Sequence, residues 1–288
     1  MQPRVDSALT LRDGRRLAYA EWGDPDGRPI LFFHGTPSGR LLHNPDPLAF
    51  EGLRTRWITV DRPGYGRSDP LARRDLLGWA RDVEALADLL GLTEFSLCGL
   101  SGGGPHALAC AYALASRVRR TAVVSGIGRL TPETLRRMYP ERRWGVRLSR
   151  TAAWIIPLLM RLVDDPRQVD RHYTKVLAKC PNDRHILECP EVRDMLKANW
   201  ADANRQGLRA YAADGRLFAL PWPFDPSAIR GTVRFWHGSA DTSIPLEMAR
   251  SLSEVIPGAT LEIVPGAGHF LFFEQFRAIV SWAAGDEG

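Results

Sequence analysis

The chain has 288 residues, of which 44% are hydrophobic and 25% charged, and its formal net charge is +5. This composition excludes intrinsic disorder, which needs fewer apolar residues and a larger charge imbalance. The 26 glycines and 21 prolines follow no short repeat, so collagen-like and low-complexity chains are excluded as well. The length suffices for one or two domains with a sizeable core.

The basic charge does not indicate nucleic-acid binding, because no run of five or six like charges occurs in the sequence. The longest strongly apolar stretch, 152–160, is too short to span a bilayer and contains Pro157. We therefore expect no stable membrane insertion. The first residues lack the apolar core of a secretory signal, which favours a cytoplasmic protein.

The four cysteines are too few for a disulfide scaffold in a chain of this length. Cys180, His185 and Cys189 lie close together, but their spacing matches no zinc pattern. We expect free thiols, no metal and no organic cofactor.

The first third of the chain predicts strands. Segments 8–11 and 16–22 flank Asp13-Gly14, a turn dipeptide, and predict an antiparallel hairpin. Short apolar runs at 30–33 and 57–60 predict buried strands.

Strands and helices then alternate, which favours a mostly parallel sheet with right-handed crossovers. The first set comprises a helix at 76–90, a strand at 95–98, a helix at 105–115 and a strand at 121–124. The second set comprises a strand at 233–236, a helix at 246–256, a strand at 261–264 and a helix at 270–282.

The middle of the chain, 128–222, breaks this alternation and predicts an inserted helical cap of about four helices, punctuated by prolines. Segments 1–127 and 223–288 would then form the core. The predicted cap holds 18 basic and 11 acidic side chains, a net charge of +7, so the basic excess of the chain lies in it. A solvated, arginine-rich surface is the favoured interpretation, and a charge that steers an anionic substrate is the alternative.

Ser101 is the candidate nucleophile, within Gly99-Leu100-Ser101-Gly102-Gly103. This G-x-S-x-G motif lies between a predicted strand and a predicted helix, the context of a nucleophile elbow. A serine on such a sharp turn needs neighbours without side chains, which the glycines provide. A glycine-rich turn without chemistry is the alternative.

A serine hydroxyl needs a base, and the base needs an acid that orients it. His269 and Asp241 each follow a predicted late strand, so both would reach the sheet edge where Ser101 lies. The order Ser, Asp, His is that of the nucleophile-elbow architecture. The rival acid position, after the strand at 121–124, holds no carboxylate.

The oxyanion hole is expected from the backbone amides of Gly102 and Thr36, the latter in the turn after the strand at 30–33. His34 and His237 each precede a glycine at a strand end and are interpreted as turn-supporting residues. Segment 61–69, DRPGYGRSD, is interpreted as a structural loop beside the site.

Together, HGTPSG, DRPGYGRSD, GLSGGG, HGSAD and GAGHF stand in an order that resembles the α/β-hydrolase superfamily over nearly the whole chain. The resemblance implies an α/β fold with an eight-stranded, mostly parallel sheet flanked by helices, and a helical cap between strands six and seven. It implies the triad Ser101, Asp241 and His269. Dehalogenases and epoxide hydrolases of the superfamily use an aspartate nucleophile, so Ser101 argues against both. HGTPSG departs from the HGGPG of prolyl iminopeptidases, which disfavours aminopeptidase activity.

The leading hypothesis is a serine hydrolase that cleaves a small or medium apolar carboxylic ester. Carbon–carbon bond hydrolysis or aminopeptidase activity with the same triad, and a ligand-binding receptor with slow turnover, are the alternatives. A monomer and a homodimer both remain open. Candidate pocket residues are His34, Trp144, Trp154, Ile155, Ile156, Leu158, Leu159, Met160 and Phe270. For those at 144–160, packing of the cap helices onto the core is the favoured interpretation, and an apolar acyl pocket is the alternative.

Overall fold

The computed structural model describes residues 2–130, 134, 136, 140–163 and 165–286, with the side chains of 140–145, 153 and 163 outside this description. Its centre is an eight-stranded sheet in the order β1-β2-β4-β3-β5-β6-β7-β8. The strands are β1 Val5–Thr10, β2 Arg16–Gly23, β3 Arg28–Phe33, β4 Thr55–Val60, β5 Phe95–Leu100, β6 Val118–Val124, β7 Thr232–Gly238 and β8 Thr260–Val264.

The sheet is mostly parallel, as expected. The β1–β2 and β2–β4 pairs run antiparallel. A short hairpin joins β1 to β2, which accounts for the first of these two pairs. The remaining five pairs, from β4 to β8, run parallel. The central strand β5 is buried along its whole length, which explains why its sequence is a short apolar run rather than an alternating one.

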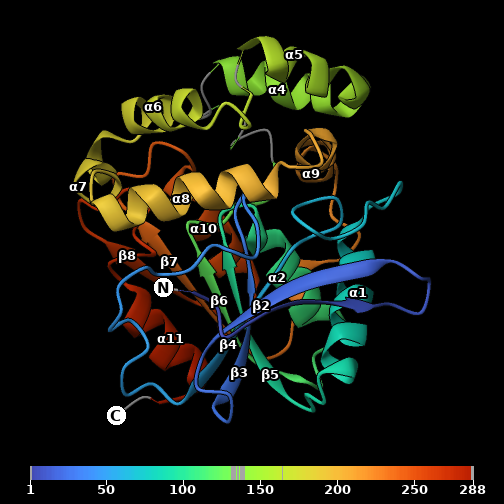
Figure 1. Ribbon diagram of the computed structural model, residues 1–288, viewed down its shortest axis with the longest axis vertical. Helices are drawn as coiled ribbons and strands as arrows, with labels where there is room; N and C mark the ends of the chain where they lie inside the picture. Colours follow the sequence, from blue (N-terminus) through green and yellow to red (C-terminus); the bar gives the residue numbers. More distant parts are fainter. Residues whose placement is uncertain (1, 131–133, 135, 137–139, 164, 287–288) are drawn as a thin grey trace.

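Helices cover both faces of the sheet (Figure 1). Buried side chains of α1 Leu76–Leu89, α2 Gly103–Ala113 and α10 Leu246–Val255 form one apolar cluster with the strands. Buried side chains of α11 Phe276–Ala284 form the second cluster on the opposite face. A short turn, η3 Pro226–Ala228, precedes β7.

A helical insertion, α4 to α9, joins β6 to β7 and lies together at one end of the sheet in Figure 1. Its elements are α4 Pro140–Thr151, η1 Ala153–Ile155, α5 Ile156–Val163, α6 Val169–Lys179, η2 Pro181–Asp183, α7 Arg184–Leu187, α8 Pro190–Ala203 and α9 Arg209–Ala219. The expectation of about four helices was too low, since the described part alone holds six α-helices. Pro181 and Pro190 each begin an element, because proline fits the first turn of a helix and not its interior.

The closing helix also begins later than expected, at Phe276 instead of residue 270. The amides of His269 and Phe270 donate to the Asp183 carboxylate, so these residues turn toward the insertion before the helix starts. Periodicity alone did not reveal this contact, because its partner lies far away in the sequence.

The turn between β5 and α2 leaves no room for a side chain at Gly103. A Cβ there would lie 2.7 Å from the Phe33 carbonyl carbon, and that atom belongs to the backbone of β3. Gly215 in α9 is a suitable comparison, because a Cβ there would meet only the Ser149 hydroxyl at 3.4 Å.

We therefore predict that Gly103→Ala lowers the free energy of unfolding by about 1–3 kcal/mol through overpacking. Gly215→Ala should leave it unchanged or raise it by up to about 1 kcal/mol, since alanine favours the helix. Chemical denaturation followed by circular dichroism measures both. Equal stability of Gly103→Ala and the wild type would contradict the tight turn.

Candidate active site

Ser101 lies on the sharp turn between β5 and α2, with a left-handed backbone φ of 52°. Its amide donates to the Val124 carbonyl at 2.9 Å, and its own carbonyl accepts from Gly104 and Ile127. A Cβ on Gly99 would lie 2.5 Å from the Gly103 carbonyl oxygen, so the two glycines face each other across the turn. The turn thus holds a non-glycine residue in an unfavourable conformation at the carboxyl edge of the sheet.

His269 and Asp241 meet Ser101 at this edge. The Nε2 atom of His269 lies 3.1 Å from the Ser101 hydroxyl, and its Nδ1 atom lies 2.8 Å from Asp241 Oδ2. The other oxygen of Asp241 accepts from the backbone amides of Ser243 and Ile244 at 2.7 and 2.9 Å. These distances fit a base that can accept the serine proton and an acid that orients the base.

The electrostatics of the acid match this arrangement. Burial raises the pKa of Asp241, but the His269 imidazole, His237 and the backbone amides outweigh it and hold the pKa below its ordinary value. His237 lies 3.4 Å from the same carboxylate, yet burial lowers its own pKa. A neutral His237 can donate through Nε2 to the Ile244 carbonyl, 3.0 Å away. Asp241 therefore stays ionised beside the His269 imidazole.

The two candidate oxyanion residues lie against each other. A Cβ on Gly102 would lie 3.0 Å from Thr36 Cβ and would overlap the Thr36 hydroxyl. Gly102 is the N-cap of α2, so its amide stands at the positive end of a helix. Neither the Gly102 nor the Thr36 amide donates a hydrogen bond to another described residue. Both amides are thus available to a developing oxyanion.

Asp183, from η2 of the insertion, is a site residue that the sequence did not indicate. Its carboxylate accepts from the backbone amides of His269 and Phe270 at 2.8 and 2.9 Å. Burial raises the pKa of Asp183, while the two amide donors act against that rise. One acidic residue in a predicted surface helix carries no signal of this contact, because the loop that it holds lies 86 residues further along the chain.

Asp214, from α9, is a second residue that the sequence did not indicate. Its buried carboxylate accepts from the Thr36 hydroxyl, the Tyr65 hydroxyl and the guanidinium groups of Arg62 and Arg74. Segment 61–69 is therefore more than a neighbouring structural loop, since Arg62 and Tyr65 connect it to the candidate oxyanion residue.

The remaining histidines have other surroundings. His106 bonds to the Gly102 carbonyl, and burial lowers its pKa to about 3. Burial and Arg62 lower the pKa of His34, whose ring nitrogens face the Gly35 carbonyl and the Arg62 amide. His43 stacks on Trp22 in the core, His172 packs edge-on against Trp200, and His185 pairs with Glu274 on the surface. None of these contacts involves Ser101.

A cavity of about 320 Å³ opens beside Thr36, between the core and the insertion. It also reaches Ile127, whose amide bonds to the Ser101 carbonyl, and Phe218, which lies against Gly102. Its lining residues are Thr36, Ile127, Leu148, Ser149, Ile156, Leu159, Met160, Tyr211, Ala212, Gly215 and Phe218. The lining is mainly apolar, and none of the described residues that form it is charged.

The candidate pocket residues from the sequence divide between this cavity and other places. Ile156, Leu159 and Met160 line it. His34 is buried behind it, and Phe270 packs against the His269 ring instead.

Trp154 and Leu158 line a separate groove of about 660 Å³, where Trp154 is 80% exposed. Ile155 lies in η1 and lines neither space, and the side chain of Trp144, in α4, lies outside the described part. Ile156, Leu159 and Met160 thus lie on one side of α5 and Leu158 on another, which a count of apolar residues cannot resolve.

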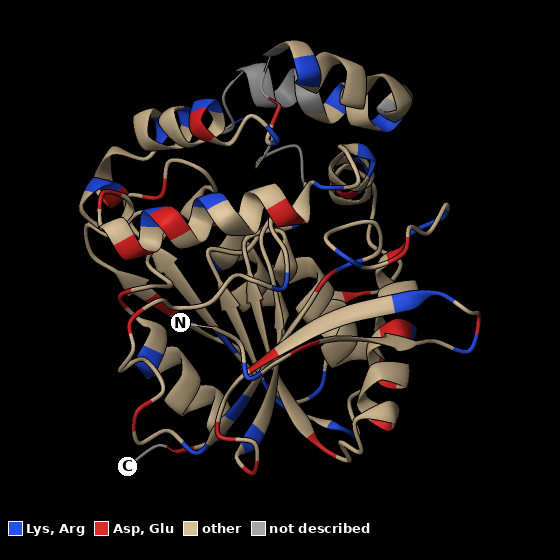
Figure 2. Cartoon of the chain, viewed as in Figure 1, with Lys and Arg blue, Asp and Glu red and all other residues tan. Residues whose placement is uncertain are grey.

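Of the basic residues of the insertion that the structure describes, none lines the cavity. Figure 2 shows Lys and Arg on the insertion and on the core alike. Four arginines line the separate groove between α5 and α9, namely Arg74, Arg161, Arg209 and Arg216. The described lining of the cavity beside Thr36 is therefore uncharged, while the groove between α5 and α9 is basic.

The thiols have separate partners. Cys180 lies near the Ser243 hydroxyl, His185 pairs with Glu274, and Cys189 donates to Glu191. Among the described residues, no group of three or more His, Cys, Asp and Glu side chains could hold a metal ion. Within the same residues, no helix is long and apolar enough to cross a membrane.

Comparison with known proteins defines the class. Residues 30–282 match the model of the alpha/beta hydrolase family, so the chain belongs to that family. A proline iminopeptidase from Neisseria gonorrhoeae is 31% identical, over 94% of this chain and 92% of its own. A non-heme haloperoxidase from Rhodococcus erythropolis is 33% identical, over 91% of this chain and 92% of its own.

Solved structures agree on the fold. An esterase from Rhodococcus sp. ECU1013 superposes with a TM-score of 0.72 over 98% of this chain and 99% of its own, at 19% identity. A hydrolase from Pseudomonas aeruginosa superposes with a TM-score of 0.73 over 99% of this chain and 100% of its own, at 21% identity. The comparisons thus show an α/β hydrolase and leave open which bond it cleaves.

The geometry predicts a single acidic limb in the pH profile. Protonated His269 cannot accept the Ser101 proton, so kcat/KM should fall about tenfold for each pH unit below the pKa of the imidazole, which is about 6.5 for an unperturbed histidine. Asp241, with its pKa lowered, stays ionised over this range. Initial rates on a nitrophenyl ester between pH 5 and 8 test this, and a flat profile would contradict His269 as the base.

Proposed function

We propose that this α/β hydrolase is a carboxylesterase that forms an acyl-enzyme at Ser101. The observation that carries the proposal is the chain of contacts from Ser101 through His269 to Asp241, with distances of 3.1 and 2.8 Å. A hydroxyl that contacts an imidazole, which in turn contacts a buried carboxylate, is the arrangement that activates serine for attack on a carbonyl. The family membership is consistent with that chemistry.

In the proposed reaction, the Ser101 oxygen attacks the ester carbonyl while His269 accepts its proton. Asp241 stabilises the resulting imidazolium, and the amides of Gly102 and Thr36 donate to the oxyanion. His269 then gives the proton to the leaving alkoxide as the carbon–oxygen bond breaks. Water, deprotonated by His269, attacks the acyl-enzyme in the same way and releases the carboxylic acid. The chemistry needs no metal and no organic cofactor.

The neutral, mainly apolar cavity favours esters of small or medium apolar acids as substrates. An aminopeptidase must bind the charged amino group of its substrate, and a buried ammonium needs a carboxylate partner. Among the described residues no acidic side chain lines the cavity, which supports an ester over the substrate suggested by the iminopeptidase relatives. Cytoplasmic location remains a prediction from the sequence.

The direct test compares the wild type with Ser101→Ala on nitrophenyl esters and with a fluorophosphonate probe. We expect ester turnover and a covalent adduct on Ser101 in the wild type, and loss of both in the variant. Turnover that survives Ser101→Ala would contradict the mechanism. Folded wild-type protein that neither turns over esters nor reacts with the probe would favour a ligand-binding receptor.

Parallel assays separate the rival reactions. Prolyl nitroanilide tests the aminopeptidase and a vinylogous diketone tests the carbon–carbon bond hydrolase, on the same protein preparation. A kcat/KM higher for either substrate than for the best ester would overturn the proposed substrate class while leaving the triad intact.

The cavity also predicts a chain-length preference that one substitution can shift. Leu159 lines the cavity, and its neighbour Leu158 lines the separate groove. Both side chains are partly exposed, so a larger residue at either position is compatible with folding. Leu159→Trp should lower kcat/KM for longer acyl chains about tenfold or more, since each buried methylene contributes about 0.8 kcal/mol, and spare acetate esters.

Leu158→Trp is the matched control and should keep the wild-type profile. A series of nitrophenyl esters from acetate to octanoate provides the measurement. An equal change in both variants would show that the cavity beside Thr36 does not receive the acyl chain.

A further inference from the structure

We propose that Asp214 of the helical insertion is a positioning residue for the oxyanion hole, acting through Arg62 and the Thr36 hydroxyl. This inference rests on the proposed function, because it assigns a task within the same site. It implies that the insertion does more than shape the substrate cavity. Docking of α9 onto the core would complete the geometry that binds the oxyanion.

The first step is the burial and ionisation of Asp214. Its carboxylate is fully buried, as is the side chain of Arg62, and the two groups bond at 2.8 Å. Arg74 binds the other carboxylate oxygen at 2.5 Å. Burial would raise the pKa of Asp214, but the two arginines outweigh it and hold the pKa below its ordinary value. A buried charge with this many partners is fixed in place, since breaking any of the bonds is costly.

The second step runs from Arg62 to the loop after β3. Its guanidinium donates to the carbonyl oxygens of His34 and Gly35. Those two residues lead directly into Thr36, so Arg62 holds the backbone that carries the Thr36 amide. Asp214 in turn fixes the orientation of the guanidinium, which stands at the centre of these contacts.

The third step is the Thr36 side chain. Its hydroxyl donates to Asp214 Oδ2 at 2.9 Å and accepts from Arg62 Nη2 at 2.8 Å. The same hydroxyl lies against Gly102, the other candidate oxyanion donor. The side chain is therefore held on both sides, and the amide of Thr36 is fixed relative to that of Gly102. A donor fixed before reaction stabilises an oxyanion without reorganisation.

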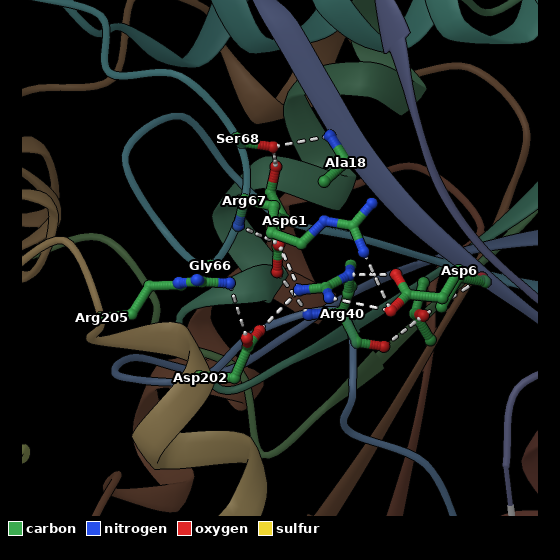
Figure 3. A network of polar contacts seen from close by, with 12 residues as sticks. Asp6, Ala18, Arg40, Asp61, Gly66, Arg67, Ser68, Asp202 and Arg205 are labelled. Atoms are coloured by element: carbon green, nitrogen blue, oxygen red, sulfur yellow. Dashed lines mark hydrogen bonds and ion pairs between the residues drawn. The ribbon is translucent and has the colours of Figure 1, made fainter.

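A second aspartate of the insertion provides a matched comparison, shown in Figure 3. Asp202, at the end of α8, binds the buried Arg40 of the core at 2.5 Å, and Arg40 also binds Asp6 and Asp61. This too is an ion pair between a carboxylate of the insertion and a core arginine. None of the contacts of Arg40 and Asp202 involves Ser101, Thr36, Gly102 or His269.

The experiment compares Asp214→Asn with Asp202→Asn. Asp214→Asn should lower the thermal unfolding temperature, because it removes the carboxylate that pairs with the buried Arg62. Asp202→Asn should lower it less, because Arg40 keeps its ion pairs with Asp6 and Asp61. Asp214→Asn should also lower kcat about 10- to 100-fold with little change in KM, as expected when an oxyanion donor is displaced. Asp202→Asn should retain wild-type kcat, measured well below its unfolding temperature.

A second pair of variants keeps the test decisive if Asp214→Asn fails to fold. Thr36→Val preserves the shape of the side chain and the backbone amide but removes the hydroxyl that joins Asp214 and Arg62. We expect it to lower kcat about tenfold or more, and Thr36→Ser, which keeps the hydroxyl, to restore most of the rate.

Inhibitor binding identifies the step that is affected. A trifluoromethyl ketone forms an oxyanion with Ser101, whereas the matching methyl ketone only occupies the cavity. Asp214→Asn and Thr36→Val should weaken binding of the trifluoromethyl ketone by the same factor by which they lower kcat. Binding of the methyl ketone should be unchanged.

Unchanged or raised kcat in folded Asp214→Asn, or equal activity of Thr36→Val and Thr36→Ser, would overturn the inference. Wild-type protein that is inactive and unlabelled would overturn the proposed function instead. If Asp202→Asn lost as much kcat as Asp214→Asn, the loss would reflect general destabilisation of the protein. That result would also overturn the inference.

Discussion

The close approach of the β5–α2 turn to the end of β3 is the constraint on which the candidate site depends. Gly103 lies against the backbone of Phe33, and Gly99 lies against Gly103, so neither position can accept a side chain. This contact leaves Ser101 with a left-handed backbone at the edge of the sheet. It also places Gly102 against the side chain of Thr36, which follows β3 by three residues. One steric contact thereby fixes both the hydroxyl and its neighbouring donors.

The second organising feature is a pair of buried aspartates in the insertion whose carboxylates bind groups of the core. Asp183 holds the loop of His269, and Asp214 holds Arg62 and Thr36. The core strands place the reacting groups within a few ångströms of one another, and these carboxylates fix the loops on which the groups stand. Helix α9 belongs to both features, because it contributes Ala212, Gly215 and Phe218 to the cavity and the buried Asp214 to the contact with the core.

Much of this arrangement could be predicted from the sequence, because it depends on local patterns. Short apolar runs indicated the strands, and the glycines around Ser101 indicated the turn. The positions of Asp241 and His269 after late strands indicated that they share an edge, and in the structure His269 Nδ1 lies 2.8 Å from Asp241 Oδ2. Each of these inferences needed only neighbours in sequence and the rule that parallel strands end at one edge.

The remaining features could not be predicted, because they depend on contacts between distant segments. Asp183 and Asp214 look like ordinary polar residues of surface helices until the helices are docked. Trp154 is a large aromatic residue in an apolar stretch, yet it is exposed beside a basic groove while Leu159 lines the cavity. Which side chains line the cavity depends on the number of helices in the insertion and on the face that each helix turns toward the core. The prolines alone specify neither.

Trapping of the acyl-enzyme tests the central claim most directly. Rapid mixing of the protein with nitrophenyl butyrate should release a burst of about one nitrophenolate per chain, and acid quenching should preserve a butyryl group on Ser101 that peptide mass spectrometry locates. His269→Ala should abolish the burst. A butyryl group on any other residue, or steady turnover with no trapped acyl group under conditions where deacylation limits the rate, would contradict the account.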